Sequence, residues 1–209
     1  YLRFIGNKNT AIILSTGMAS MEEIELAVKT ILETGNKNIC VLHCVSIYPA
    51  SSEIINLNNI NNLRERLNVP IGYSDHTVGI EVPIAAVAMG APIIEKHFTL
   101  DKNQIGMDNQ MATEPDEFKN MIRLCKSANL SLGSFDRVVS EEEMIQRTNM
   151  RRSIVAKRDL EQGEFLKAED IIYKRPGNGI PPTDADKVIG KKVNKKIKAD
   201  HLIFSDDLS

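Results

Sequence analysis

The sequence has no long apolar run, no excess of charge of one sign and only three cysteines, Cys40, Cys44 and Cys125. Without a run of about 18 apolar residues, no segment is expected to span a bilayer. A net charge of −2 argues against nucleic acid or an anionic membrane as a main partner. An odd number of cysteines in apolar segments favours buried thiols over disulfides or zinc ligands, and a cytoplasmic location.

Four short apolar segments alternate with helical patterns in the first 130 residues. They are "AIILSTG" (11–17), "NICVLHC" (38–44), "VPIGYSDH" (69–76) and "APIIEKHFT" (91–99). Continuous apolar runs of this length are typical of strands buried on both faces of a parallel sheet. A capping box at Ser20 and Glu23 predicts the start of one helix, and Thr113 with Pro115 predicts another. Four strand–helix units in a row predict an α/β architecture.

Polar side chains follow every one of these segments at the same end. The groups are Ser15 and Thr16, His43 to Tyr48, Ser74 to Thr77, and Glu95 to Thr99. The loops at the carboxyl ends of parallel strands converge on one mouth, where α/β proteins build their sites. These side chains, Asp75 among them, are therefore expected to line one pocket.

Two histidines at the ends of consecutive strands suggest a metal site. Neighbouring strands lie about 4.8 Å apart, so inward-facing His76 and His97 could bind one divalent ion. The carboxylates of Asp75, Glu95 and Asp108 could be ligands, orient ligands or accept hydrogen bonds from a substrate. The alternative is that these are unrelated polar residues at strand ends, because histidine often serves only as a partner of backbone groups. His43, inside "CVLHCV", is interpreted as a packed core residue.

The last 60 residues change character, with short β-like runs, many turns and a weak internal repeat. Residues 158–171, "RDLEQGEFLKAEDI", match residues 195–208, "KKIKADHLIFSDDL". The matched pairs are Leu160 with Ile197, Phe165 with Leu202, Leu166 with Ile203, Asp170 with Asp207, and Ile171 with Leu208. Gly163 matches Asp200, a replacement that a turn with positive φ tolerates. We expect a pseudo-symmetric β-rich module at 153–209, joined to residues 1–130 by a polar linker at 131–152.

Six motifs in order carry a resemblance to a known family. "ILSTGM", "LHCVSIYP", "IGYSDHT" and "IIEKHFTLD" are followed by "RRSIVA" and "KRPGNGI". Together they resemble the sialic acid synthase family, which makes N-acetylneuraminate and related nine-carbon acids. The C-terminal module resembles the antifreeze-like (SAF) domain of these synthases. The resemblance implies the C-terminal half, four βα units, of a TIM (β/α)8 barrel, followed by a small β-rich SAF domain.

The resemblance also implies a reaction and a set of site residues. Phosphoenolpyruvate would condense with the aldehyde of an N-acetylated hexosamine and release phosphate, with a divalent metal, usually Mn²⁺, polarising the aldehyde oxygen. The implied residues are His76 and His97 as metal ligands, Ser15 and Ser74 on phosphoenolpyruvate, Tyr48, Ser46 and Asp108 on the sugar, and Arg175 reaching the other subunit of a domain-swapped homodimer. The alternative for Arg175 is a solvated surface side chain.

Two departures from the family pattern lie on the sugar side. Ser46 stands where asparagine is common, and "GMDNQMA" (106–112) replaces a common Pro-Asp pair, although Asp108 keeps its place. N-acetylmannosamine is therefore the default substrate, with the precursors of legionaminic or pseudaminic acid left open.

The length also departs from the family. A closed barrel takes about 250 residues, and the carboxylate and lysines of the family's first half have no match here. We expect a fragment of a synthase or a split gene product, with an exposed strand edge. The alternatives are another metal-dependent aldol-type barrel enzyme, distinguished by the fate of the phosphate, and a non-catalytic fragment that binds carbohydrate or a protein partner.

Overall fold

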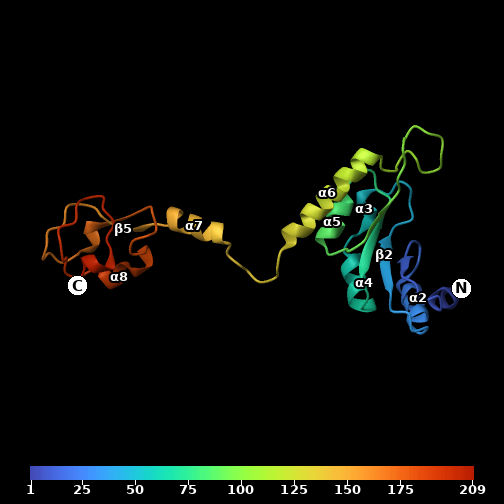
Figure 1. The fold of residues 1–209 in the computed structure, drawn as a ribbon, viewed down its shortest axis with the longest axis horizontal. Helices are drawn as coiled ribbons and strands as arrows, with labels where there is room; N and C mark the ends of the chain where they lie inside the picture. The colour runs from blue at the N-terminus through green and yellow to red at the C-terminus, as the bar shows by residue number, and fades with distance from the viewer. The chain divides into compact units, whose positions relative to one another are not determined.

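The computed structural model describes residues 1–209 as two compact units, Tyr1–Gly133 and Ser134–Ser209. In Figure 1 the first unit runs from blue to yellow-green and the second from yellow to red. No helix in either unit combines the length and the apolar character needed to cross a membrane. Each unit has its own hydrophobic core, and each is described by itself.

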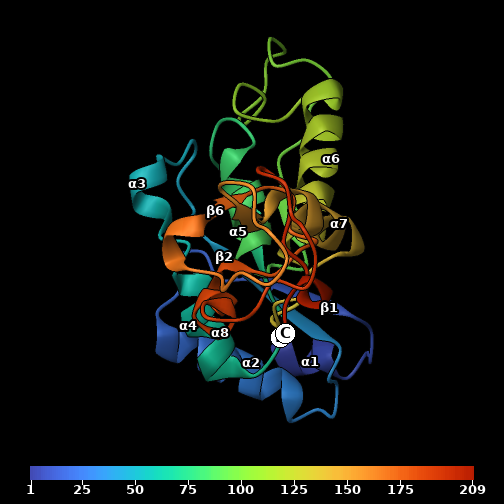
Figure 2. The ribbon, with the colours of Figure 1, turned by 90° about the vertical axis from the view of Figure 1, so that its left-hand side faces the viewer.

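A four-stranded parallel sheet forms the centre of the first unit. Its strands follow chain order: β1 (Ile12–Ser15), β2 (Ile39–Cys44), β3 (Ile71–Asp75) and β4 (Ile94–Lys96). The helices are α1 (Leu2–Gly6), α2 (Met21–Leu32), α3 (Ser52–Ile55), α4 (Asn59–Leu67), α5 (Glu81–Ala88) and α6 (Pro115–Leu132). Helices α5 and α6 lie side by side in both views (Figures 1 and 2). The predicted α/β architecture is confirmed.

The two faces of this sheet have different surroundings. Residues of one face, including Val41, Ile71 and Tyr73, pack with helical residues such as Ile31 and Leu63 in the core. Strands β2 and β3 are buried almost throughout, as predicted, whereas β1 and β4 alternate between half-buried and exposed residues. The difference arises because β1 and β4 are the edge strands of this sheet and have a neighbour on one side only.

The predicted start of α2 is confirmed, but the predicted start of α6 is wrong by one residue. Ser20 Oγ accepts from Glu23 N, and the Glu23 carboxylate accepts from Ser20 N at 2.8 Å, which completes the capping box. Glu114, rather than Thr113, is the residue before α6. The backbone of Thr113 instead bridges the end of β4, donating to the His97 carbonyl and accepting from Thr99 N.

The second unit begins with a helix that the sequence patterns did not reveal. Helix α7 (Glu141–Met150) occupies much of the predicted polar linker, and Ser140 Oγ accepts from Glu143 N at 3.1 Å to cap it. The remaining elements are β5 (Ser153–Ala156), η1 (Ala168–Asp170), β6 (Ile171–Lys174), η2 (Pro182–Asp184), α8 (Ala185–Val188) and η3 (Ser205–Asp207). Strands β5 and β6 pair antiparallel.

The internal repeat of the second unit is visible in its hydrogen bonds. The matched residues Leu160 and Ile197 donate to each other's carbonyl groups at 2.8 and 2.9 Å, so an approximate two-fold axis passes between them. Gly163 and Asp200 both have positive φ, 94° and 66°. The matched pattern therefore describes two structurally equivalent halves.

The same symmetry relates two buried carboxylates. Asp170 accepts from the backbone N–H of Lys167 at the start of η1, and Asp207 accepts from Phe204 N at the start of η3. Each also pairs with a basic side chain from the equivalent position, Arg158 in the first repeat and Lys195 in the second.

Candidate active site

Side chains of β3 and β4 alternate between the two faces of the sheet, and this alternation brings His76 and His97 together. Ser74 pairs with Glu95 in the parallel register, and the next residues on the same face are the two histidines that follow the strands. Their ring centroids lie 5.2 Å apart with an interplanar angle of 68°. The sheet thus presents two imidazoles to the same volume.

His76 is held in one orientation by the chain after β2. Its side chain is buried, and Nδ1 lies 2.8 Å from the Val45 carbonyl oxygen. A carbonyl oxygen only accepts, so Nδ1 of the neutral ring carries the proton and Nε2 keeps its lone pair. Ala50 N donates to the His76 carbonyl at 2.9 Å, which ties the same loop to the end of β3.

Tyr48 and Asp108 lie at the two histidines. The Tyr48 ring centroid is 4.2 Å from that of His76 and 5.8 Å from that of His97. Asp108 Oδ2 is 3.7 Å from His97 Nδ1, beyond hydrogen-bonding distance. Tyr48 is 48% exposed, so it is not sealed in the core.

Ser74 and Ser15 occupy the same face of the sheet. The Ser74 hydroxyl donates to Glu95 Oε1 at 2.7 Å, so that carboxylate fixes its direction. Ser15 ends β1 on this face, as the strand register shows. Glu95 was one of the predicted candidates for a metal ligand, a group that orients ligands or a hydrogen-bond acceptor, and its two-residue spacing from His97 places both on one face.

Ser46 packs against the loop that follows β1. A Cβ atom added to Gly17 would lie 2.0 Å from Ser46 Oγ, and Cys44 Sγ is 3.8 Å from that oxygen. The loops after β1 and β2 therefore touch at Ser46 and Gly17, whereas Tyr48, two residues later, meets the histidines.

Asp75 faces away from the histidines, so the expectation that it lines the pocket or binds the metal there is wrong. Its carboxylate is fully buried on the core side of β3 and pairs with Lys96 Nζ at 2.5 Å. Tyr73 and Thr77 also donate to it. Residues 74 and 76 share a face and residue 75 takes the other, because side chains alternate along a strand. Burial, and secondarily Asp75, raises the pKa of Tyr73 well above its ordinary value.

Arg175 belongs to the second unit, where it docks on the end of α7. Its Nε donates to the Met150 carbonyl at 2.9 Å, and Gly177 N donates to the Thr148 carbonyl at 2.7 Å. This uses one of the five N–H donors of the guanidinium, and the group is exposed.

The donor groups fit a divalent ion with two protein ligands. Imidazole nitrogen suits transition metals, and the Val45 contact leaves His76 Nε2 unprotonated in the neutral ring. No cluster of three or more His, Cys, Asp or Glu residues is placed to hold a metal. A metal bound by His76 and His97 would accordingly keep several coordination positions for water or substrate oxygen.

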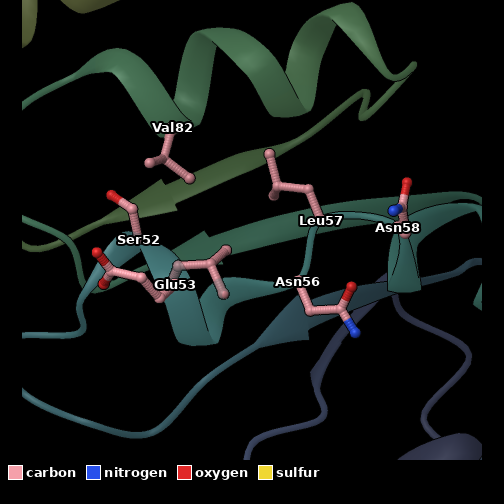
Figure 3. A pocket seen from close by; sticks show the side chains of 7 residues that line it. Ser52, Glu53, Asn56, Leu57, Asn58 and Val82 are labelled. Carbon is pink, nitrogen blue, oxygen red and sulfur yellow. The ribbon is translucent and has the colours of Figure 1, made fainter.

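A separate open hollow lies near the start of α5. Figure 3 shows Ser52, Glu53, Asn56, Leu57, Asn58 and Val82 around it, from the α3–α4 segment and α5. None of its lining residues is a predicted site residue, and the arrangement of groups just described lies at the strand ends instead.

Parallel strands in chain order with polar groups gathered at their carboxyl ends define part of a (β/α) barrel and its site. The chain belongs to the NeuB family, whose model matches residues 1–137, and the SAF domain model matches residues 151–209. The resemblance of the sequence motifs to the sialic acid synthases is thereby confirmed.

Three relatives illustrate the match. The N,N'-diacetyllegionaminic acid synthase of Legionella pneumophila is 39% identical over 95% of this chain and 57% of its own length. The human N-acetylneuraminate-9-phosphate synthase is 34% identical over 99% of this chain and 58% of its own length. The crystal structure of the Leptospira borgpetersenii N-acetylneuraminic acid synthetase, in complex with citrate, is 39% identical, covers 69% of this chain and 51% of that one, and gives a TM-score of 0.64. The chain thus spans less than two thirds of these relatives.

Proposed function

We propose that this chain contributes the metal and sugar side of a synthase that joins phosphoenolpyruvate to an N-acetylated hexosamine. The product would be a nine-carbon 2-keto acid, and phosphate would be released. Family membership and the names of the relatives support the reaction class. The observation that carries the proposal is the 5.2 Å distance between the ring centroids of His76 and His97 at the carboxyl ends of adjacent strands.

The bonds of the proposed reaction balance without an oxidant or reductant. C3 of phosphoenolpyruvate bonds to the aldehyde carbon, whose oxygen takes up a proton and becomes a hydroxyl group. Water adds at C2 and gives up both of its protons: one balances the proton taken up by the aldehyde oxygen, and the other goes to the phosphate, which leaves as the C2–O bond breaks and the keto group forms. A divalent ion, Mn²⁺ by the family resemblance, would polarise the aldehyde oxygen when bound by His76 and His97.

The residues of this chain would bind and orient the two substrates. The Val45 carbonyl keeps the proton of His76 on Nδ1, so the other ring nitrogen keeps a lone pair with which it could bind a metal. Ser15 and Ser74 would donate to the anionic oxygens of phosphoenolpyruvate. For that, the Ser74 hydroxyl must turn from Glu95, or Glu95 must move with it.

The sugar-binding residues would be Tyr48, Asp108 and Ser46. The Tyr48 ring and the Asp108 carboxylate lie beside the histidines, and the Tyr48 hydroxyl and that carboxylate would hydrogen-bond the sugar. Ser46 would act at the edge of the same region, through the loop that carries Tyr48. The names of the relatives motivate two substrate types, a monoacetylated hexose and a diacetylated one.

Phosphate release tests the proposal. Because the chain spans 57% of the Legionella synthase, it is assayed alone and joined to the unmatched portion of that protein. We expect release that requires phosphoenolpyruvate, Mn²⁺ and one of N-acetylmannosamine or a diacetylated hexose. The variant His76→Ala/His97→Ala should lose it, whereas His201→Ala, an exposed histidine of the second unit, should not.

Three results would count against the proposal. Phosphate release that does not require the sugar would argue against the condensation. Phosphate release by the variant that lacks both histidines would argue against their role as metal ligands. Condensation of pyruvate in place of phosphoenolpyruvate, without phosphate, would indicate another aldol-type enzyme.

A further inference from the structure

A buried ion pair lies directly behind the two histidines, on the opposite face of the same two strands. The side chains of Asp75 and Lys96 are 0% and 2% exposed, and Lys96 Nζ lies 2.5 Å from Asp75 Oδ2. These residues are register partners of β3 and β4. Each immediately precedes one of the histidines, and together they form the last register pair of β3 and β4.

The hydrogen bonds of this pair enclose His76 along the chain. Asp75 Oδ1 accepts from the backbone N–H of Thr77 at 3.0 Å and from its hydroxyl at 2.9 Å. Lys96 Nζ also donates to the Thr77 carbonyl at 2.7 Å. The residues on both sides of His76 are thereby tied to the residue before His97.

Strand pairing alone gives this end of the sheet little support. Strand β4 has three residues, and only three register pairs join it to β3. Beyond Lys96, the His97 carbonyl accepts from Thr113 N at 2.8 Å, a bond to the segment before α6 and not to β3. Two side-chain links therefore join these strands next to the histidines, the Ser74–Glu95 hydrogen bond on the histidine face and the buried ion pair on the other.

The cost of burying charge argues that the ion pair is kept for geometry. Removing two charges from water costs several kcal/mol, and apolar residues of similar volume often replace a buried pair without loss of stability. An apolar pair, however, would not bind the Thr77 backbone, which lies on the far side of His76 from Asp75. The directional bonds are what an apolar replacement would lose.

We propose that Asp75 and Lys96 are positioning residues that fix the separation and orientation of His76 and His97. The metal part of this inference rests on the proposed function. The structural part, that the pair keeps His76 bonded through Nδ1 to Val45, concerns the metal-free protein alone.

The variant that tests it is Asp75→Leu/Lys96→Met, which removes both charges and leaves no unpaired ion. Thr77→Val is a milder second variant that keeps the ion pair and removes only the hydroxyl contacts. Arg158→Met/Asp170→Leu removes an ion pair of the second unit and is the matched control. All are made in the full chain, and circular dichroism establishes that each is folded.

Two readouts separate the structural and metal parts. In metal-free protein, the ¹⁵N signals of the His76 ring should report a single Nδ1–H tautomer in wild type and the control, and a mixture in the double variant. Mn²⁺ titration followed by electron paramagnetic resonance should show affinity weakened about 10- to 100-fold, as for other residues that orient metal ligands. Thr77→Val should shift both readouts in the same direction by less.

The outcomes distinguish the two proposals. A folded double variant with the wild-type tautomer would overturn the positioning role, and so would unchanged Mn²⁺ affinity. A Thr77→Val variant identical to wild type in both readouts would overturn the part assigned to Thr77. If the double variant does not fold, the same result for Thr77→Val would overturn the whole inference. Wild-type protein that binds no Mn²⁺ would contradict the proposed metal site, and the tautomer would still decide the role of the pair.

Discussion

His43 shows how burial decides the protonation of a single side chain. The residue lies in the first unit with Nε2 2.7 Å from the Ile55 carbonyl oxygen, so Nε2 of the neutral ring carries the proton. Burial lowers the pKa of His43 below its ordinary 6.5, and the bond to Ile55 opposes this only in part. The unfolded chain therefore binds a proton here at a higher pH than the folded protein does.

The consequence is a loss of stability as the pH falls. We expect the stabilising effect of neutral His43 to be present above pH 6.5 and to decline below it. The variant His43→Leu should make the free energy of unfolding less dependent on pH between 7.5 and 5.5, measured by urea denaturation. His201→Leu, at an exposed site, is the control. Equal pH dependence in His43→Leu and wild type would contradict the assignment.

Gly17 gives a second prediction for a single residue. A Cβ atom there would lie 2.0 Å from Ser46 Oγ. We expect Gly17→Ala to destabilise the first unit by about 1–3 kcal/mol, the usual cost of overpacking. Ser46→Gly should relieve much of this cost when combined with Gly17→Ala, in a double-mutant cycle followed by urea denaturation. An additive cycle would mean that the two loops do not press on each other.

At the scale of elements, the sequence predicted the strands and the repeat, which follow from local residue patterns. It missed features that depend on contacts with other parts of the chain. The four strands of the first unit and the repeat of the second were predictable, because runs of apolar residues and matched spacings are local patterns. Helix α7 was missed because it has no buried residue and hence no apolar stripe. Asp75 was assigned to the pocket because composition, unlike strand alternation, does not say which face a side chain takes.

The repeat predicts equal roles for Asp170 and Asp207. Each carboxylate is buried, accepts a backbone N–H at the start of a short helix and pairs with a basic side chain. Because charged hydrogen bonds contribute about 1.5–3 kcal/mol, Asp170→Ala and Asp207→Ala should destabilise the second unit by similar amounts. Hydrogen exchange of the amides of residues 153–209 in the whole chain would measure this. A large effect of one variant and none of the other would show that the halves are unequal energetically.

At the scale of the whole molecule, the proposed role of Arg175 requires a second copy of the chain. If its guanidinium completes the site of the other subunit, His97→Ala and Arg175→Ala each inactivate the completed enzyme but in different halves of the shared site. Refolding the two variants together should restore about a quarter of wild-type activity, because half of the symmetric dimers then contain one intact site. Refolding each alone should restore none. If the mixture forms dimers but has no activity, Arg175 does not act in the site of the other subunit.

The reciprocal bonds between Leu160 and Ile197 have a consequence for the origin of the second unit. In a two-fold interface between identical subunits, a residue that lies next to the axis meets the same residue of the other subunit. Here the corresponding positions lie on one chain. A peptide of about half the SAF domain that paired with itself, followed by duplication and fusion of its gene, would leave this pattern, since the axis of such a dimer survives when its subunits are joined.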